Sequence, residues 1–301
     1  MPARKLPFIE HFGVARRFWW NADFLELMSR RWRLDEVSRA LDVGCGAGHW
    51  TAVLTTLLPP SAEVVGVDRD HGWLELARQG VRDSASPNRP RFEPGVAESL
   101  PFPDASFDMV TCQTLLMHLP DPGAALREMR RVLEPGGLLA IVEPSNLVQT
   151  LLPGSPEAHD EVDDVLARVR FQLVCERGRE ALGEGAFSVG DRLADLVTSL
   201  GLKDVQVYQS NKAFPFFPPY DTNEQAAIVG EISADGADAD GWIWSQDDSK
   251  RYFLKGGGTA AEFAIAWARI GARNRLERRG LADRTFHRTG GRIVYLVSGR
   301  K

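Results

Sequence analysis

The stretch Leu41-Asp42-Val43-Gly44-Cys45-Gly46-Ala47-Gly48 decides the fold of this chain. The apolar run that ends at Val43 predicts a buried parallel strand, and residues 49–58 have the length and periodicity of a helix that follows it. The glycines therefore lie in the strand-to-helix turn. Glycine suits this turn because it adopts a positive φ at little cost and has no Cβ to keep a ligand away from the backbone.

An acidic residue extends this pattern. Asp68 ends the next apolar run, Val64-Val65-Gly66-Val67, twenty residues after Gly48. An acid at this position of a nucleotide-binding α/β fold accepts hydrogen bonds from the ribose hydroxyls. The glycine spacing is Gly-x-Gly-x-Gly, whereas the dinucleotide fingerprint is Gly-x-Gly-x-x-Gly beside a pyrophosphate. The pattern therefore predicts a nucleoside cofactor without phosphates.

Two further blocks are highly specific. They are Leu-Pro-Phe-Pro-Asp-Ala-Ser-Phe-Asp at residues 100–108 and Leu-Arg-Glu-Met-Arg-Arg-Val-Leu-Glu-Pro-Gly-Gly at residues 126–137. With them the chain resembles the class I S-adenosylmethionine-dependent methyltransferases, closely over residues 39–145 and faintly beyond. The resemblance implies an α/β fold with a doubly wound, mostly parallel seven-stranded sheet of the Rossmann-like type. It also implies S-adenosyl-L-methionine as cofactor and S-adenosyl-L-homocysteine as product.

The chain departs from the family pattern in its second half. In the family the last two strands form an antiparallel hairpin, but here the candidate strands at residues 205–208 and 293–297 are more than eighty residues apart. A helical cap must be inserted between them, and the run Gly256-Gly257-Gly258 predicts a flexible join between its helices. The predicted domains are an N-terminal helical lid (1–38), the cofactor-binding core (39–145), a helical cap segment (146–186), a continuation of the core (187–212), the cap insertion (213–290) and a final core strand (291–301).

Both inserted segments would leave the sheet near its cofactor end, because ligands bind outside the carboxyl ends of parallel strands. We therefore expect them to roof the reacting methyl group. The alternative is that they are additions for stability or dimerisation, remote from the site, so a homodimer remains open. The aromatic residues of the helical pattern at 9–32 similarly fit either a lid over the cofactor or core packing.

Residue type and resemblance together assign the cofactor contacts. Backbone groups of the glycine turn would approach the ribose and methionine, Asp42 would hold the methionine ammonium through water, and Arg69 would cover the adenine face. Val96 stands where the family commonly has an acid for the adenine amino group, so this contact moves to Glu98, whose alternative is a solvated first-turn residue. The predicted cofactor-binding residues are Asp42, Gly44, Cys45, Gly46, Gly48, Asp68, Arg69, Ala97, Glu98 and Gln113.

The implied reaction is an in-line displacement, in which positioning dominates and a base is needed only for an acceptor that must lose a proton. Glu143 and His118 are the candidate catalytic residues. Glu143 follows the fifth predicted strand, and its alternative is a carboxylate that caps nearby backbone. Histidine can act as a base near neutral pH, but His118 commonly has a supporting role in related sequences.

Composition favours a small-molecule acceptor. The chain has 301 residues, 44% of them hydrophobic, with a formal net charge of −5 and no dense block of Lys and Arg. This argues against a nucleic-acid or anionic-membrane partner. No apolar run approaches the roughly 20 residues that span a bilayer, and the N-terminus lacks the pattern of a signal peptide. Arginine outnumbers lysine, which indicates a GC-rich bacterial genome, and we expect reduced cysteines and a cytoplasmic location.

The three cysteines, Cys45, Cys112 and Cys175, have no zinc or disulfide spacing, and no set of metal ligands is evident. The sequence thus predicts a methyltransferase, without an assigned metal site, that acts on an O, N or C atom of a small molecule, in the range of secondary metabolites. The alternatives are a protein or peptide side-chain methyltransferase and a cofactor-binding regulatory subunit without turnover.

Overall fold

The computed structural model describes residues 16, 18–82, 88–151, 154–155, 160–234 and 243–301. The chain divides into two compact units. The sheet unit consists of Trp20–Ser145, Ser188–Asn211 and Val294–Lys301. The helical unit consists of Met1–Trp19, Asn146–Phe187 and Lys212–Ile293. The domain boundaries expected after residues 145, 186, 212 and 290 fall close to these divisions, whereas residues 20–38 group with the sheet.

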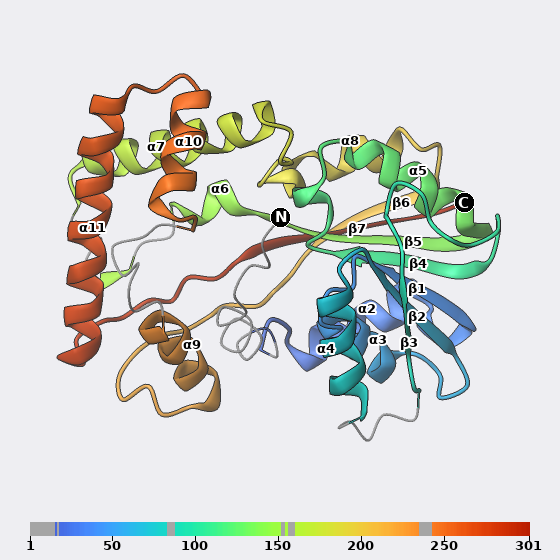
Figure 1. Cartoon of the computed structure of the whole chain (residues 1–301). Coiled ribbons are helices and arrows are strands. Elements are labelled where there is room, and N and C mark those ends of the chain that lie inside the picture. Colours follow the sequence, from blue (N-terminus) through green and yellow to red (C-terminus); the bar gives the residue numbers. More distant parts are fainter. Residues whose placement is uncertain (1–15, 17, 83–87, 152–153, 156–159, 235–242) are drawn as a thin grey trace. The chain divides into compact units, whose positions relative to one another are not determined.

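The sheet unit is built on seven strands in the order β3-β2-β1-β4-β5-β7-β6 (Figure 1). The strands are β1 Arg39–Val43, β2 Glu63–Asp68, β3 Arg91–Pro94, β4 Phe107–Gln113, β5 Leu133–Ser145, β6 Lys203–Gln209 and β7 Ile293–Arg300. The pairs β1–β2, β1–β4, β2–β3 and β4–β5 are parallel, and β6–β7 is antiparallel. The predicted seven-stranded, mostly parallel sheet with a widely separated last strand pair is therefore confirmed.

Both faces of this sheet are covered. Helices α2 (Ala22–Trp32) and α3 (His49–Leu57) pack on one face, where Met28 and Trp50 join alternate residues of β5 in the main hydrophobic core. Helices α5 (Pro122–Val132) and α8 (Leu193–Thr198) lie along the opposite face (Figure 1). The neighbouring residues Leu138 to Val142 are all buried, as expected for a strand that is covered on both sides.

The predicted N-terminal helical pattern is interrupted where it is described. Arg16 is helical, residues 18–20 form a turn and bend, and helix α2 begins at Ala22. Its buried residues Phe24, Met28 and Trp32 belong to the main core, and Trp20 packs against Phe24 and Trp50. Core packing thus accounts for the aromatic residues of this helix. Residues 1–15 and 17 lie outside the described part of the chain, so the lid stays a prediction.

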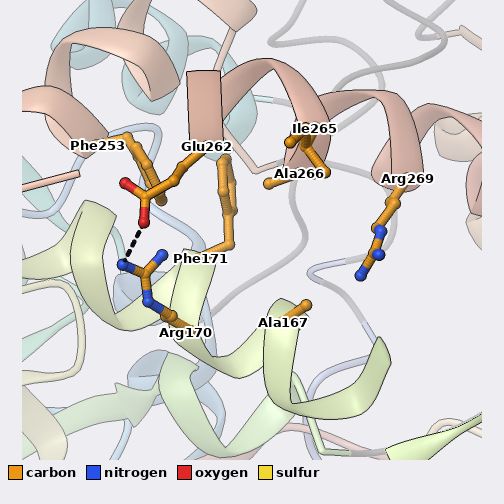
Figure 2. Close-up of a pocket in the computed structure, with 8 residues that line it drawn as sticks. All are labelled: Ala167, Arg170, Phe171, Phe253, Glu262, Ile265, Ala266 and Arg269. Atoms are coloured by element: carbon orange, nitrogen blue, oxygen red, sulfur yellow. Dashed lines mark hydrogen bonds and ion pairs between the residues drawn. The ribbon is translucent and has the colours of Figure 1, made fainter. Parts of the chain in front are cut away.

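The helical unit has its own core. Its helices are α6 (Asn146–Gln149), α7 (Val162–Ala181), α9 (Asn223–Ala234), α10 (Gln246–Lys255) and α11 (Ala260–Ala282). Phe171, Phe253 and Phe263 pack ring to ring where α7, α10 and α11 meet. An ion pair of 2.9 Å joins Arg170 of α7 to Glu262 of α11 beside a cavity of about 180 Å³ (Figure 2).

The glycines after α10 lie in crowded surroundings. A β-carbon on Gly256 would collide with the carbonyl oxygen of Val174, and one on Gly178 would collide with the carbonyl of Tyr252. A β-carbon on Gly258 would likewise enter the ring of Phe253. The run joins α10 to α11 as predicted, and its flexibility stays a prediction. Gly256 and Gly178 form a close-packing contact between α10 and α7. Small residues were needed because two helix backbones touch there.

Among the described residues, no helix combines the length and the apolar character that a transmembrane segment requires.

Candidate functional site

The glycine turn connects β1 to α3 as predicted. Gly44, Gly46 and Gly48 have φ values of 69°, 52° and 81°, a left-handed region that other residues rarely adopt. Gly48 is the N-cap of α3. The backbone of this turn therefore requires glycine at these three positions.

Four amide groups of this turn donate hydrogen bonds within the protein. The N–H groups of Gly44 and Cys45 donate to the carbonyl oxygen of Val67 at 2.7 and 3.0 Å. The N–H of Gly46 donates to the Asp68 carboxylate at 2.9 Å, and that of Gly48 donates to the Cys45 carbonyl at 2.9 Å. A pyrophosphate at such a turn needs free N–H groups. The turn instead offers carbonyl oxygens and carboxylates, which suit hydroxyl and ammonium donors.

Asp68 lies at the end of β2, next to the turn. One carboxylate oxygen accepts from Gly46 N–H, and the other accepts from the N–H of Asp70 at 2.9 Å. The side chain is half-buried. Each carboxylate oxygen has two lone pairs, so Asp68 can accept further hydrogen bonds from a ligand while it holds the turn.

Asp42 lies on β1 and is completely buried. Its Oδ2 accepts a hydrogen bond of 2.6 Å from the Thr51 hydroxyl of α3, whereas its Oδ1 has no partner among the described groups. Burial raises the pKa of Asp42 to about 7, although the Thr51 hydrogen bond opposes this shift. An ammonium group bound nearby, directly or through water, would supply the missing donor and favour the ionised carboxylate.

The other predicted contacts follow β3 and β4. The ends of β1 to β4 meet at one edge of the sheet because neighbouring strands there are parallel. After β3, the amide of Gly95 donates to the Asp68 carbonyl at 3.1 Å, Ala97 is buried and Glu98 is half-buried. Gln113 ends β4 and is buried. The structure thus brings the predicted positions of four strand ends to one edge.

Val96 and Arg69 differ from this buried set. The side chain of Val96 is 46% exposed and Arg69 is exposed. Arg69 and Glu98 lie at the expected edge of the sheet, and the adenine contacts assigned to them stay predictions.

Cys45 contributes packing. Its side chain lies in a small core cluster with Leu74, Ala77 and Phe92. Burial, together with the charges of Asp42 and Asp68, holds the pKa of the Cys45 thiol well above its usual range. Cys45 therefore stays a neutral thiol and fits a backbone contact.

The two catalytic candidates have different surroundings. Glu143 is completely buried in β5, and its Oε1 accepts hydrogen bonds from the amides of Leu115 and Leu116 at 2.7 and 2.6 Å. Burial raises the pKa of Glu143 to about 8, against the effect of these hydrogen bonds. His118 is exposed at the end of the 3₁₀ helix η2 (Leu116–His118). The geometry of Glu143 is that of the backbone-capping alternative.

Sequence reasoning missed three residues of this edge. Thr51 donates to Asp42, Leu115 fills the space beside Gly44, and Thr114 has a φ of 53° although it is not glycine. A hydroxyl on the inward face of α3 was a signal for Thr51. The other two depend on contacts between loops far apart in the sequence, so no local pattern indicates them.

The arrangement is thus an α/β domain in which the ends of β1 and β2 present carboxylates and carbonyl oxygens, the acceptors that hydroxyl and ammonium donors require. Within the described residues, no group of His, Cys, Asp and Glu could hold a metal ion.

Comparisons with known proteins agree with this class. Residues 41–141 match the family model of a methyltransferase domain. Demethylmenaquinone methyltransferases of Staphylococcus aureus (strains JH9 and Newman) are 43% identical to the chain over 108 residues, which are 36% of this chain and 44% of each relative. The match therefore spans less than half the length of these relatives.

Solved structures share the fold at low sequence identity. The YcgJ protein of Bacillus subtilis has a TM-score of 0.50 at 21% identity, with 93% of this chain and 100% of that chain covered. The [4+2]-cyclase SpnF has a TM-score of 0.52 at 16% identity, with 98% and 94% covered. Residues 41–141 thus match a methyltransferase domain, and the sheet has the fold that the resemblance to class I S-adenosylmethionine-dependent methyltransferases predicts.

Proposed function

We propose that this protein transfers a methyl group from S-adenosyl-L-methionine to an O, N or C atom of a small molecule. The observation that carries the proposal is which hydrogen-bonding groups the glycine turn leaves available to a ligand. Four of its amides are bonded within the protein, while a buried oxygen of Asp42 lacks a partner among the described groups. This set fits a ribose and an ammonium better than a pyrophosphate.

Within this proposal each residue has a defined task. Asp68 accepts from the ribose hydroxyls, Asp42 holds the ammonium, and Gln113 lies beside the methionine end. Carbonyl oxygens of Gly44 and Gly46 add acceptors for the cation. The adenine is assigned to Arg69, Ala97 and Glu98, and Cys45 and Gly48 keep the shape of the turn.

S-adenosyl-L-methionine, when bound, supplies a sulfonium methyl group for in-line displacement and leaves as S-adenosyl-L-homocysteine. The protein then has to hold the acceptor in line and exclude water. For an acceptor that must lose a proton, His118 is the better placed of the two candidate bases because it is exposed. The Oε1 of Glu143 is committed to two backbone amides.

The acceptor is less defined than the donor. The relatives are named for demethylmenaquinone, but they match only about a third of this chain. The fold alone also hosts other chemistry, as the cyclase SpnF illustrates. We therefore propose a small-molecule acceptor as the substrate class, with demethylmenaquinone as the first to test, in a bacterial cytoplasm.

The proposal is tested by incubating the protein with methyl-labelled S-adenosyl-L-methionine and a panel of quinol, phenol and amine acceptors. We expect equal amounts of S-adenosyl-L-homocysteine and one labelled small molecule, and much less of both with Asp68→Ala when the methyl donor is not saturating. Label on added proteins or peptides alone would support the side-chain methyltransferase instead. Cofactor binding without transfer to any acceptor would support the regulatory subunit.

A further inference from the structure

The turn after β4 contains a residue in a rare backbone conformation. Thr114 has a φ of 53°, which is uncommon for a residue with a side chain. Its amide donates to the carbonyl of Val142 on β5 at 2.9 Å. A residue in this region persists only where the surrounding structure holds it. The groups that hold Thr114 therefore control the shape of the turn.

Glu143 is the side chain that holds the residues immediately after Thr114. Its Oε1 accepts from the amides of Leu115 and Leu116 at 2.7 and 2.6 Å. These amides begin η2, where N–H groups have no partner inside the helix. The side chain of Glu143 is completely buried, so water does not compete for these amides. One carboxylate oxygen thus fixes two consecutive residues of the turn.

The turn after β4 also contacts the glycine turn after β1. The space that a β-carbon on Gly44 would need is occupied by the Leu115 side chain, whose Cδ1 would be only 2.5 Å away. Gly44 is the first glycine of the predicted cofactor site and has a φ of 69°. Contacts therefore run from Glu143 on β5, through Leu115 after β4, to Gly44 after β1. All three residues belong to the sheet unit.

We propose that Glu143 is a positioning residue of the methyl-donor site, which holds residues 114–118 so that Leu115 packs on Gly44 and Gln113 keeps its place. The identity of the ligand rests on the proposed function, but the effect on the turn does not. A base role makes a different demand, since it would need Glu143 to exchange a proton with the acceptor.

Two substitutions separate these roles. Glu143→Ala removes the acceptor of both amides, whereas Glu143→Gln keeps a carbonyl oxygen at the position of Oε1. In the protein without ligand, Glu143→Ala should speed hydrogen exchange at residues 115–116 at least about tenfold, because two buried hydrogen bonds are lost. It should also weaken S-adenosyl-L-homocysteine binding, measured by calorimetry, by about tenfold. Glu143→Gln should restore most of both.

Leu115→Ala is the matched third variant. It keeps the Glu143 hydrogen bonds and removes only the contact with Gly44, so binding should weaken about tenfold while exchange at residues 115–116 stays slow. If Glu143→Ala does not fold, Glu143→Gln and Leu115→Ala still decide the matter. Circular dichroism of each variant shows whether the fold is kept.

The proposal is overturned if exchange at residues 115–116 and binding are unchanged in Glu143→Ala. It is also overturned if Glu143→Gln binds normally, exchanges slowly and yet loses all methyl transfer, which is the behaviour of a base. Failure of the wild type to bind S-adenosyl-L-homocysteine would contradict the donor assignment instead. In that case the exchange experiment still tests the hold of Glu143 on the turn.

Discussion

Replacement of Asp68 should weaken cofactor binding, because its carboxylate accepts a hydrogen bond from the Gly46 amide and is the predicted acceptor for the ribose hydroxyls. We expect Asp68→Ala to weaken S-adenosyl-L-homocysteine binding by about 1.5–3 kcal/mol, the usual cost of losing charge-assisted hydrogen bonds. Calorimetry measures this change. Asp104→Ala, which removes an exposed acid paired with Arg131, is the control and should bind normally. Equal affinity of the Asp68 variant and wild type would refute the ribose assignment.

Asp42 should make stability depend on pH. The folded protein raises its pKa from 3.8 to about 7, so between these values the folded state holds a proton that the unfolded state has released. The stabilising contribution is complete below about pH 4 and is lost as pH rises through about 7. Asp42→Asn cannot titrate. Its stability relative to wild type should therefore increase by about 2 kcal/mol between pH 5 and pH 8.

Urea unfolding of both proteins at each pH measures this difference, and other titrating groups cancel in the comparison. The Asn variant should also bind S-adenosyl-L-homocysteine more weakly, because it offers no charge to an ammonium. A difference in stability that does not change with pH would show that Asp42 is ionised throughout in the folded protein.

Single residues were predictable where chemistry follows from local spacing. The glycines, Asp42 and Asp68 occupy the expected turn and strand end. Glu143 shows the limit, because its partners are amides on another strand's loop and no pattern around residue 143 indicates them. The role of a side chain at a strand end depends on what the next loop places against it.

At the scale of elements, the sequence predicts the helices and strands whose hydrophobic periodicity or capping residues lie within the element itself. The strands of the core, α3 and α11 have clear periodicity or capping, and Thr259 with Glu262 forms a capping box at the start of α11. The bounds of helix α10 were not predicted, because half of its residues are charged and it buries few side chains, chiefly Tyr252 and Phe253. Its place is set by contact with α7, which is tertiary information.

This contact gives a prediction for Gly178 of α7. Gly178→Ala should destabilise the protein by about 1–3 kcal/mol or more, because the new β-carbon collides with the backbone of α10. Helix propensity alone would stabilise the same change by about 1 kcal/mol. Gly230→Ala in α9 is the matched control, since its β-carbon would meet no atom within 4 Å. Thermal unfolding should show opposite shifts, and two equal shifts would contradict the packing contact.

At the scale of the whole molecule, the matched family covers residues 41–141 and the helical unit lies outside that match. The predicted methyl-donor site therefore lies in the part of the chain that matches a known family. The site for the methyl acceptor is expected to involve segments outside that match. The expected role of residues 146–186 and 213–290 as a roof over the methyl group stays a prediction, with dimerisation as its alternative.

Hydrogen exchange of the whole chain tests the roof. S-adenosyl-L-homocysteine should slow exchange at residues 44–48, 95–98 and 113–118, because these lie at the predicted site. If the insertions cover the donor, residues 214–220 should slow as well. Slowing confined to the sheet unit would contradict the roof, and sedimentation would then show whether the helical unit serves a dimer.

The central claim is that this domain binds a phosphate-free nucleoside cofactor. The most direct test is calorimetric titration of the purified protein with S-adenosyl-L-homocysteine and, separately, with NAD. We predict micromolar binding of the first and none of the second. Binding of NAD without S-adenosyl-L-homocysteine would contradict the assignment of the glycine turn and of every function derived from it.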